Sequence, residues 1–214
     1  MTGKTAPAAV RSTYRHGDLR RALLDAGIQL ARDGGPEAVV LREATRRTGV
    51  APNAAYRHFA NHKELLQAVR SAALSQLAVA IETELAGVTT STSAAEQARA
   101  ALRAVGTAYM RFAQDEIGLF LTAFSIPDEM NGVEDKSKAG PGGLNPFELL
   151  CAALDRMVVT GALPPERRPG AEFLAWSAVH GMARLVIDGP LRKIPREKLD
   201  LLTQRLLVMV ENGL

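Results

Sequence analysis

Helix-start signals recur along this chain and constrain its fold more than any other feature of the sequence. Three segments, NHKE at 61–64, SAAE at 93–96 and NPFE at 145–148, place Asn or Ser three residues before Glu. At that spacing the two side chains can each accept a hydrogen bond from a free backbone N–H at a helix start. Alanine and leucine dominate between these segments, and no alternating apolar and polar pattern persists. The chain is therefore predicted to be all-α.

The caps and the apolar periodicity together predict about nine helices. We expect them at about 18–32, 41–48, 52–59, 62–86, 94–114, 116–124, 146–160, 170–188 and 195–211. The segment 125–144 is rich in Gly, Pro, Asn and Asp, a composition that predicts a mobile loop.

The composition excludes several classes of protein. The 214 residues are 47% hydrophobic with a mean hydropathy of −0.02, which is the balance of a folded domain rather than of a disordered or membrane protein. No window reaches the about 18 uninterrupted apolar residues of a membrane span, and the first residues lack the apolar core of a secretory signal. The single cysteine, Cys151, excludes an internal disulfide and a cysteine-based zinc site. We expect a cytoplasmic protein with no metal, no cofactor and no membrane partner.

Positive charge is concentrated in the first third of the chain. Residues 1–70 hold 12 Lys and Arg against 6 Asp and Glu, whereas the remainder holds 14 against 17. A basic segment on an acidic body predicts a polyanionic partner for that segment alone. A chance excess of charge on a solvated face is the alternative.

The stretch GVAPNAAYRHFANHKELL at 49–66 combines a turn with a short helix that has one polar face. Gly49 stands where a tight turn needs a positive φ, and Val50 supplies an apolar anchor. On the helix that follows, Ala55 and Phe59 lie one turn apart and are predicted to face inward. The spacing of helix, glycine turn and second helix is typical of a helix-turn-helix unit.

The opposite face of this second helix carries groups that suit a DNA major groove. Its asparagine and arginine can pair with base edges, its tyrosine and histidine can donate to phosphates, and its small alanine allows close approach. Its proline, at the first helical position, presets the helix start. The candidate DNA-binding residues on this helix are Pro52, Asn53, Ala54, Tyr56, Arg57 and His58.

The run YRHGDLRRALLDAGIQLARDGGPEAVVLREATRRTGVAPNAAYRHFANHKELLQAV resembles the DNA-binding domain of the tetracycline-repressor (TetR) family of transcriptional regulators. The resemblance implies a homodimer whose recognition helices occupy successive major grooves of double-stranded DNA, with a larger helical domain that binds a small effector. It also implies a groove position for Arg42 and backbone positions for His62 and Lys63. The family's usual lysine at the start of the next helix is here His62, with Lys63 one place later, so the sequence leaves open which of the two contacts phosphate.

The resemblance divides the chain into three parts. Residues 1–13 are predicted to be a flexible basic arm, 14–62 the helix-turn-helix domain, and 63–214 an effector-binding and dimerisation domain. Arg15, just past the arm, is a further candidate for DNA contact, because basic arms can enter a minor groove. A disordered solubilising tail is the alternative for the arm.

The segment FLAWSAVHGMARLVIDG places Trp176 and His180 four residues apart on one predicted helix face. The pattern Trp-x-x-x-His-Gly resembles the C-terminal domain of the TetR branch named for those three letters. In that context both residues are candidates for the wall of a ligand cavity, with an ordinary core position as the alternative. Other interior candidates for an adaptable apolar cavity are Tyr109, Phe112, Phe120, Phe124, Phe147 and Cys151.

The last two predicted helices carry more apolar surface than packing within one chain would bury. The first brings small residues and a leucine together, and the second has an apolar stripe with further apolar residues beside it. We interpret the pair as a two-fold dimer interface of four helices. The candidate interface residues are Ala178, Gly181, Leu185, Leu199, Leu202, Leu206 and Met209. The alternative is a terminal helix that packs only on its own chain.

These patterns favour a ligand-responsive DNA-binding regulator, and repression is the family's commoner mode. The expected effector is a small apolar or amphipathic molecule. A helical protein-interaction adaptor is the rival hypothesis, and it leaves the basic first third unexplained. An enzyme is the least favoured class, because the sequence contains none of the nucleophile, phosphate-loop, dinucleotide or zinc-protease motifs.

Overall fold

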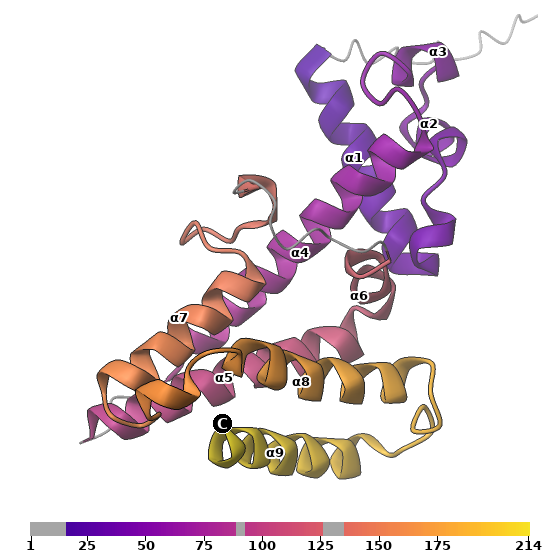
Figure 1. Ribbon diagram of the computed structural model, residues 1–214. Coiled ribbons are helices and arrows are strands. Elements are labelled where there is room, and N and C mark those ends of the chain that lie inside the picture. Colours follow the sequence, from indigo (N-terminus) through magenta and orange to yellow (C-terminus); the bar gives the residue numbers. More distant parts are fainter. Residues whose placement is uncertain (1–15, 89–92, 126–134) are drawn as a thin grey trace, which may run out of the picture.

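The computed structural model describes residues 16–88, 93–125 and 135–214, and within them it contains nine α-helices, three short 3₁₀ turns and no strand (Figure 1). The predicted arm and Arg15 lie outside the described residues. The α-helices are α1 His16–Gly34, α2 Leu41–Thr48, α3 Pro52–Ala55, α4 His62–Ala86, α5 Ala94–Asp115, α6 Ile117–Ala123, α7 Pro146–Val159, α8 Ala171–Ile187 and α9 Arg196–Gly213. The 3₁₀ turns are η1 Pro36–Ala38, η2 Lys136–Lys138 and η3 Pro165–Arg167. The prediction of an all-α chain with about nine helices is confirmed for the described part.

The three predicted caps form as the sequence indicates. Asn61 and Ser93 each accept a hydrogen bond from the backbone N–H three residues later, at the starts of α4 and α5. At α7 the capping box is complete, because Asn145 accepts from the Glu148 N–H while the Glu148 carboxylate accepts from the Asn145 N–H. These bonds need only neighbouring residues, which is why a local pattern could predict them.

The first three helices form one end of the molecule, and α4 begins there and runs on into the larger helical body (Figure 1). Gly49 ends α2 in the left-handed conformation, with φ 68° and ψ 24°, as the turn requires. One prediction needs correction, since the regular α-helix of α3 ends at Ala55 rather than near residue 59. The chain still completes a helical turn there, because the Phe59 N–H donates to the Ala55 carbonyl.

The body is built around α5, which packs against α4, α7, α8 and α9. The long helix α4 is buried along much of its length against α5, α6 and α7. Helices α8 and α9 lie side by side as an antiparallel pair at the far end from α3 (Figure 1). None of the described helices combines the length and the apolar character that crossing a bilayer would require.

The predicted loop 125–144 is described only in its second half. Residues 126–134 lie outside the described residues. Two hydrogen bonds join residues 135–144 to α4, and the predicted mobility of the loop stays a prediction. The Ser75 hydroxyl donates to the Ala139 carbonyl at 2.7 Å, and the Gly142 N–H donates to the Glu82 carboxylate at 3.0 Å.

A short helix, α6, joins the two ends of the molecule. It packs against both α1 and α4. Gly118 brings its backbone so close to the last turn of α1 that a Cβ atom there would stand 2.1 Å from the Ala31 carbonyl oxygen. Beside this contact the Arg32 guanidinium binds the Glu116 carboxylate at 2.7 Å and the Gln76 side chain at 3.1 Å. The junction between α6 and α1 is therefore tightly packed, and hydrogen bonds beside it hold the two helices together.

Candidate nucleic-acid interface and internal cavity

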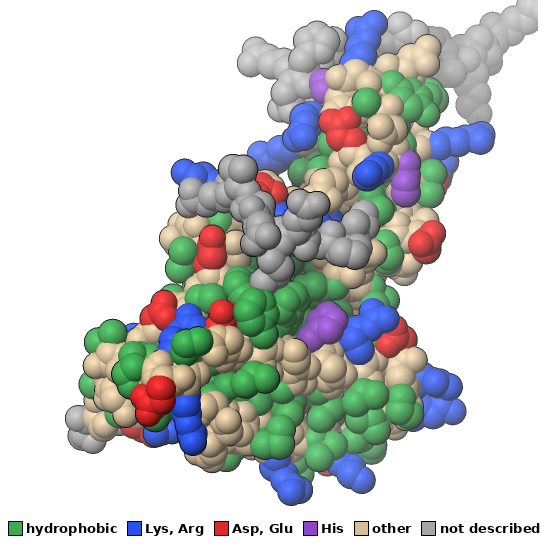
Figure 2. Space-filling model, viewed as in Figure 1, with side chains coloured by type: hydrophobic (Ala, Val, Ile, Leu, Met, Phe, Trp, Pro, Cys, Tyr) green, Lys and Arg blue, Asp and Glu red, His purple; other side chains and the backbone are tan. Residues whose placement is uncertain are grey.

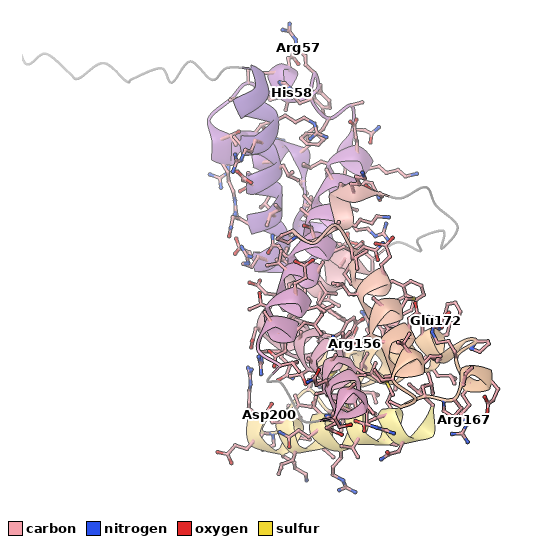
Figure 3. All side chains as sticks on the ribbon, turned by 90° about the vertical axis from the view of Figure 1, so that its left-hand side faces the viewer. Arg57, His58, Arg156, Arg167, Glu172 and Asp200 are labelled. Carbon is pink, nitrogen blue, oxygen red and sulfur yellow. The ribbon has the colours of Figure 1, made fainter. Side chains whose placement is uncertain are left out.

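Helix α3 and the helical turn that continues it to Phe59 present a polar face at one end of the molecule. Ala55 and Phe59 are fully buried, and the Arg20 guanidinium lies 4.9 Å from the centre of the Phe59 ring and covers it. On the outer side Asn53 and Arg57 are exposed, and Figure 3 shows Arg57 at the tip, pointing away from the body. The two faces of α3 are thus divided as the sequence predicted.

The remaining candidates on α3 and on the helical turn after it differ in their exposure. The Tyr56 side chain is 56% exposed, an unusual state for a tyrosine on the surface of a small helical unit. Pro52 is also exposed, whereas Ala54 and His58 are half-buried. The exposed proline leaves the start of the helix open to approach.

The arginines of the helix-turn-helix differ in what they bind. Arg46 forms two hydrogen bonds to the Glu43 carboxylate, and this hydrogen bonding lowers the pKa of Glu43 to about 2. Arg47 binds Asp33 at 3.1 Å. Arg42 and Arg57, by contrast, are exposed and form no ion pair with any residue in the part of the chain that the structure describes. Their guanidinium groups are therefore available to an anionic partner without breaking an internal bond.

The start of α4 lies next to this face. His62 and Lys63 are the first two residues of α4 and both are exposed. Asn61 occupies the N-cap, and the Glu64 carboxylate accepts from the Ala60 N–H at 2.7 Å. With the cap filled by protein groups, the basic side chains exposed at this helix start are those of His62 and Lys63.

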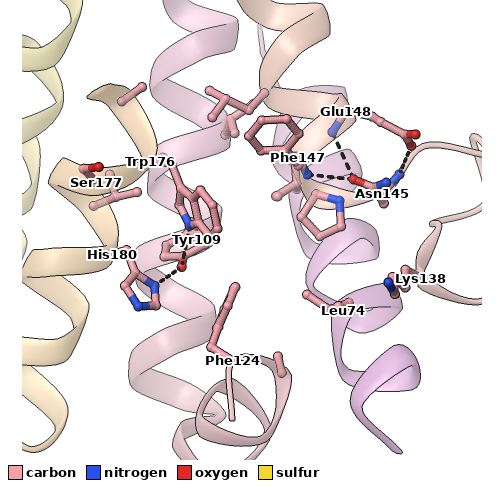
Figure 4. Close-up of a pocket in the computed structure, with 18 of the residues that line it drawn as sticks. Leu74, Tyr109, Phe124, Lys138, Asn145, Phe147, Glu148, Trp176, Ser177 and His180 are labelled. Atoms are coloured by element: carbon pink, nitrogen blue, oxygen red, sulfur yellow. Dashed lines mark hydrogen bonds between the residues drawn. The ribbon is translucent and has the colours of Figure 1, made fainter. Parts of the chain in front are cut away.

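A cavity of about 870 Å³ lies inside the larger body, between α4, α5, α7 and α8, with α9 at one end (Figure 4). Five of the eight predicted ligand residues stand on its wall, namely Tyr109, Phe124, Phe147, Trp176 and His180. The other three do not. Phe120 is fully buried behind the Tyr109 and Phe124 rings, Phe112 is core, and Cys151 is a half-buried residue outside the lining whose thiol pKa is raised by burial.

Three of these side chains form a hydrogen-bonded chain on the cavity wall (Figure 4). Trp176 Nε1 donates to the Tyr109 hydroxyl at 3.2 Å, and the same hydroxyl lies 2.7 Å from His180 Nδ1. Burial raises the pKa of Tyr109 above its ordinary value, so the phenol keeps its proton. Burial, together with the nearby Arg184 cation, lowers the pKa of His180, so the imidazole is neutral at pH 7.

The cavity also has a polar side that the sequence did not reveal. Lys138 and the capping pair Asn145 and Glu148 line it, as does Arg70, whose side chain is almost fully buried and donates to the Ala123 carbonyl at 3.0 Å. The capping pattern marked Asn145 and Glu148 as a helix start, but no local pattern placed them beside a cavity with Lys138, because η2 reaches α4 only through the tertiary fold. An arginine on the inward face of α4 was the one available signal.

Exposed apolar side chains gather on α8 and α9, at the end of the molecule opposite α3 (Figure 2). We call this surface the α8–α9 apolar face; its members are Leu174, Leu185, Leu201, Val208 and Met209. Gly181 lies among them and an added Cβ there would meet nothing within 4 Å.

The predicted interface residues divide between this face and the interior. Gly181, Leu185 and Met209 are exposed, and Ala178 is half-buried. The predicted stripe on α9 is divided, because Leu199 is only 4% exposed, Leu202 and Leu206 are half-buried, and Met209 is 61% exposed. Leu199 lies on the same α9 face as the buried Thr203 and Leu207, so this side of the helix is used by its own chain.

Comparisons with known proteins agree with this arrangement. Residues 23–69 match the family model described as bacterial regulatory proteins, tetR family, and residues 102–210 match the model described as tetracyclin repressor-like, C-terminal domain. The comparison with curated proteins gave no match.

Solved structures share the fold at low sequence identity. A protein of unknown function from Rhodococcus sp. RHA1 is 22% identical with a TM-score of 0.74, over 95% of this chain and 99% of its own. The TetR family transcriptional regulator PfmR from Thermus thermophilus is 21% identical with a TM-score of 0.52, over 90% of this chain and 98% of its own. A transcriptional regulator from Rhodococcus sp. Rha1 is 20% identical with a TM-score of 0.52, over 91% and 96%. With a family helix-turn-helix at one end and a family C-terminal domain over half of its length, the chain belongs to the TetR family of transcriptional regulators.

Proposed function

We propose that this protein is a cytoplasmic repressor that binds a pseudo-palindromic DNA operator as a homodimer and releases it when a small apolar or amphipathic effector enters the cavity. One observation carries the proposal: the same chain has two features that such a regulator needs. On the helix-turn-helix, Arg42 and Arg57 form no ion pair with any described residue, and the body holds an aromatic cavity of about 870 Å³. A cavity of that size is within the range of sites that enclose small molecules, about 300–1,000 Å³. The assignment to the Trp-x-x-x-His-Gly branch stays a prediction.

The route from cavity to DNA runs through α6. Phe124, which follows α6, stands on the cavity wall and also lines a second, smaller cleft beside α1. At the other end of α6, Gly118 touches the last turn of α1. An effector that moves Phe124 would therefore displace α6 and, through it, the helix-turn-helix. A coupling of about 1–3 kcal/mol between the two sites would suffice to shift the operator-bound population.

The proposal is tested first by selecting the bound sequence from random duplexes and measuring its affinity by fluorescence anisotropy. Replacement of Arg57 by alanine is expected to weaken binding of the selected operator by about 1–3 kcal/mol and to relax sequence preference at one position of each half-site. Arg192→Ala, an exposed arginine between α8 and α9, is the matched control and should leave affinity unchanged. Failure of the wild-type protein to prefer any duplex at moderate salt would refute the regulator hypothesis.

Lys63 should behave differently from Arg57, because a phosphate contact carries no sequence information. Lys63→Ala is expected to weaken binding to all duplexes alike and to reduce the slope of log affinity against log salt by about 1. His62→Ala measured in the same titrations decides between the two neighbours. If the salt slope changes with His62→Ala and stays constant with Lys63→Ala, the phosphate contact belongs to the histidine.

A further inference from the structure

The hydrogen-bonded chain Trp176–Tyr109–His180 determines where the imidazole carries its proton. The indole N–H can only donate, so it occupies a lone pair of the Tyr109 oxygen. The phenol proton is then directed to His180 Nδ1, because the Tyr109 oxygen has no other hydrogen-bond partner among the described residues. In the reverse arrangement the buried phenol proton would have no acceptor, which is costly in an apolar site.

A neutral imidazole that accepts at Nδ1 carries its proton on Nε2. Nε2 has no hydrogen-bond partner in the described part of the chain, it is not fully buried, and its residue lines the cavity. The wall holds other N–H groups, such as those of Arg70 and Lys138, but the His180 N–H is the donor whose position on the ring is set by Tyr109.

The surroundings of this donor are aromatic. The Phe120 ring stacks on the imidazole with centres 5.7 Å apart, and the Phe124 and Trp176 rings lie 5.0 and 6.0 Å away. Such walls suit a flat apolar molecule, and the low local dielectric strengthens a hydrogen bond formed there. At the far side of the cavity Asn145 and Glu148 are already engaged in the α7 capping box.

We propose that His180 Nε2 donates a hydrogen bond to a neutral acceptor oxygen, such as a ketone or amide carbonyl, on a planar apolar effector. Tyr109 is the positioning residue that holds the imidazole in this tautomer. The inference deepens the proposed function, since it names the chemical class of molecule that the cavity takes.

Two flat probes that differ only in the acceptor test this ligand class. Fluorenone carries a ketone on the ring system of fluorene, and equilibrium dialysis measures the affinity of the protein for either. The wild-type protein is expected to bind fluorenone about threefold to tenfold more tightly than fluorene, the range for one net hydrogen bond. His180→Phe should abolish that preference, whereas His180→Gln, which can place an N–H near the position of Nε2, should keep part of it.

The tautomer is tested separately by nitrogen-15 NMR of the His180 ring. The spectrum of the wild-type protein should show a protonated Nε2 and an unprotonated Nδ1, and Tyr109→Phe should give a mixture of both tautomers. A side chain that only fills space would not change this signature. A protonated Nδ1 in the wild type would overturn the inference, and so would equal affinity for the two probes, binding of neither, or a ketone preference that survives in His180→Phe.

These outcomes separate the inference from the proposed function. Operator binding without ketone preference refutes the ligand class alone. Ketone preference in a protein that selects no operator refutes the regulator and leaves the ligand class standing. Ketone binding that leaves operator affinity unchanged refutes the coupling between the two sites.

Discussion

Replacement of Gly118 by alanine is expected to lower the free energy of unfolding by about 1–3 kcal/mol, the usual cost of forcing an extra group into a packed interior. The new Cβ would stand 2.1 Å from the Ala31 carbonyl oxygen and 2.6 Å from that of Arg32. Both atoms belong to the backbone of α1, so relief requires α6 and α1 to move apart. For a domain of this size the change corresponds to a fall in Tm of about 2–4 °C per kcal/mol.

The matched control for this substitution is Gly106→Ala on α5. Its Cβ would also meet a close atom, 2.3 Å away, but that atom is the tip of the Leu207 side chain. A side-chain tip can rotate, and alanine favours the helix over glycine by about 0.5–1 kcal/mol, so the control should be nearly neutral. Thermal unfolding followed by circular dichroism compares the two variants. An equal loss of stability in both would show that the contact at the α6–α1 junction has no special rigidity.

Gly118→Ala should also change operator affinity if α6 carries the signal from the cavity to the DNA. A variant that still folds at low temperature should show this change even without ligand. An unchanged operator affinity combined with a lowered Tm would place the route from cavity to DNA elsewhere.

Substitution of Gly181 by arginine is expected to convert the protein to a monomer and to weaken operator binding by more than about 100-fold, because two linked half-site contacts become independent. Gly181 lies on the α8–α9 apolar face, and the space around it is open within the protomer. The variant should therefore keep its fold and its Tm as a monomer. A charged side chain in an apolar four-helix contact is costly because the charge loses its water.

Ala152→Arg is the control for added charge. Ala152 is an exposed small residue on α7 and is not a member of the α8–α9 apolar face, so the variant should remain dimeric. Sedimentation velocity at micromolar concentration measures the oligomeric state of both variants, and anisotropy measures their operator affinity. A Gly181→Arg protein that sediments as a dimer would exclude this face as the interface.

The sequence by itself determined the features that depend on neighbours along the chain. The caps at Asn61 and Asn145 form because their partners stand three residues away. Gly49 takes a positive φ because the turn allows little else, and the two faces of α3 follow from helical periodicity. The family resemblance adds the helix-turn-helix assignment, because its motif is contiguous.

Only the tertiary structure decided which of several similar side chains reaches the cavity, which is buried in the core and which stays exposed. Periodicity places Phe120 and Phe124 both inside, but α6 meets α5 and α8 so that only Phe124 reaches the cavity. On α9 a stripe of leucines could face either way, and packing on α5 and α8 turned Leu199 inward and left Leu201 exposed.

Charge follows the same rule. Arg47 and Arg57 are indistinguishable as basic residues of a helix-turn-helix, yet Arg47 is held by Asp33, fourteen residues away, and Arg57 projects at the tip. The tautomer of His180 likewise depends on Tyr109, which lies on a different helix. Local hydrogen bonds and helical periodicity can be predicted from short stretches of sequence, whereas cavities, interfaces and ion pairs arise between distant segments whose relative placement only the packed core sets.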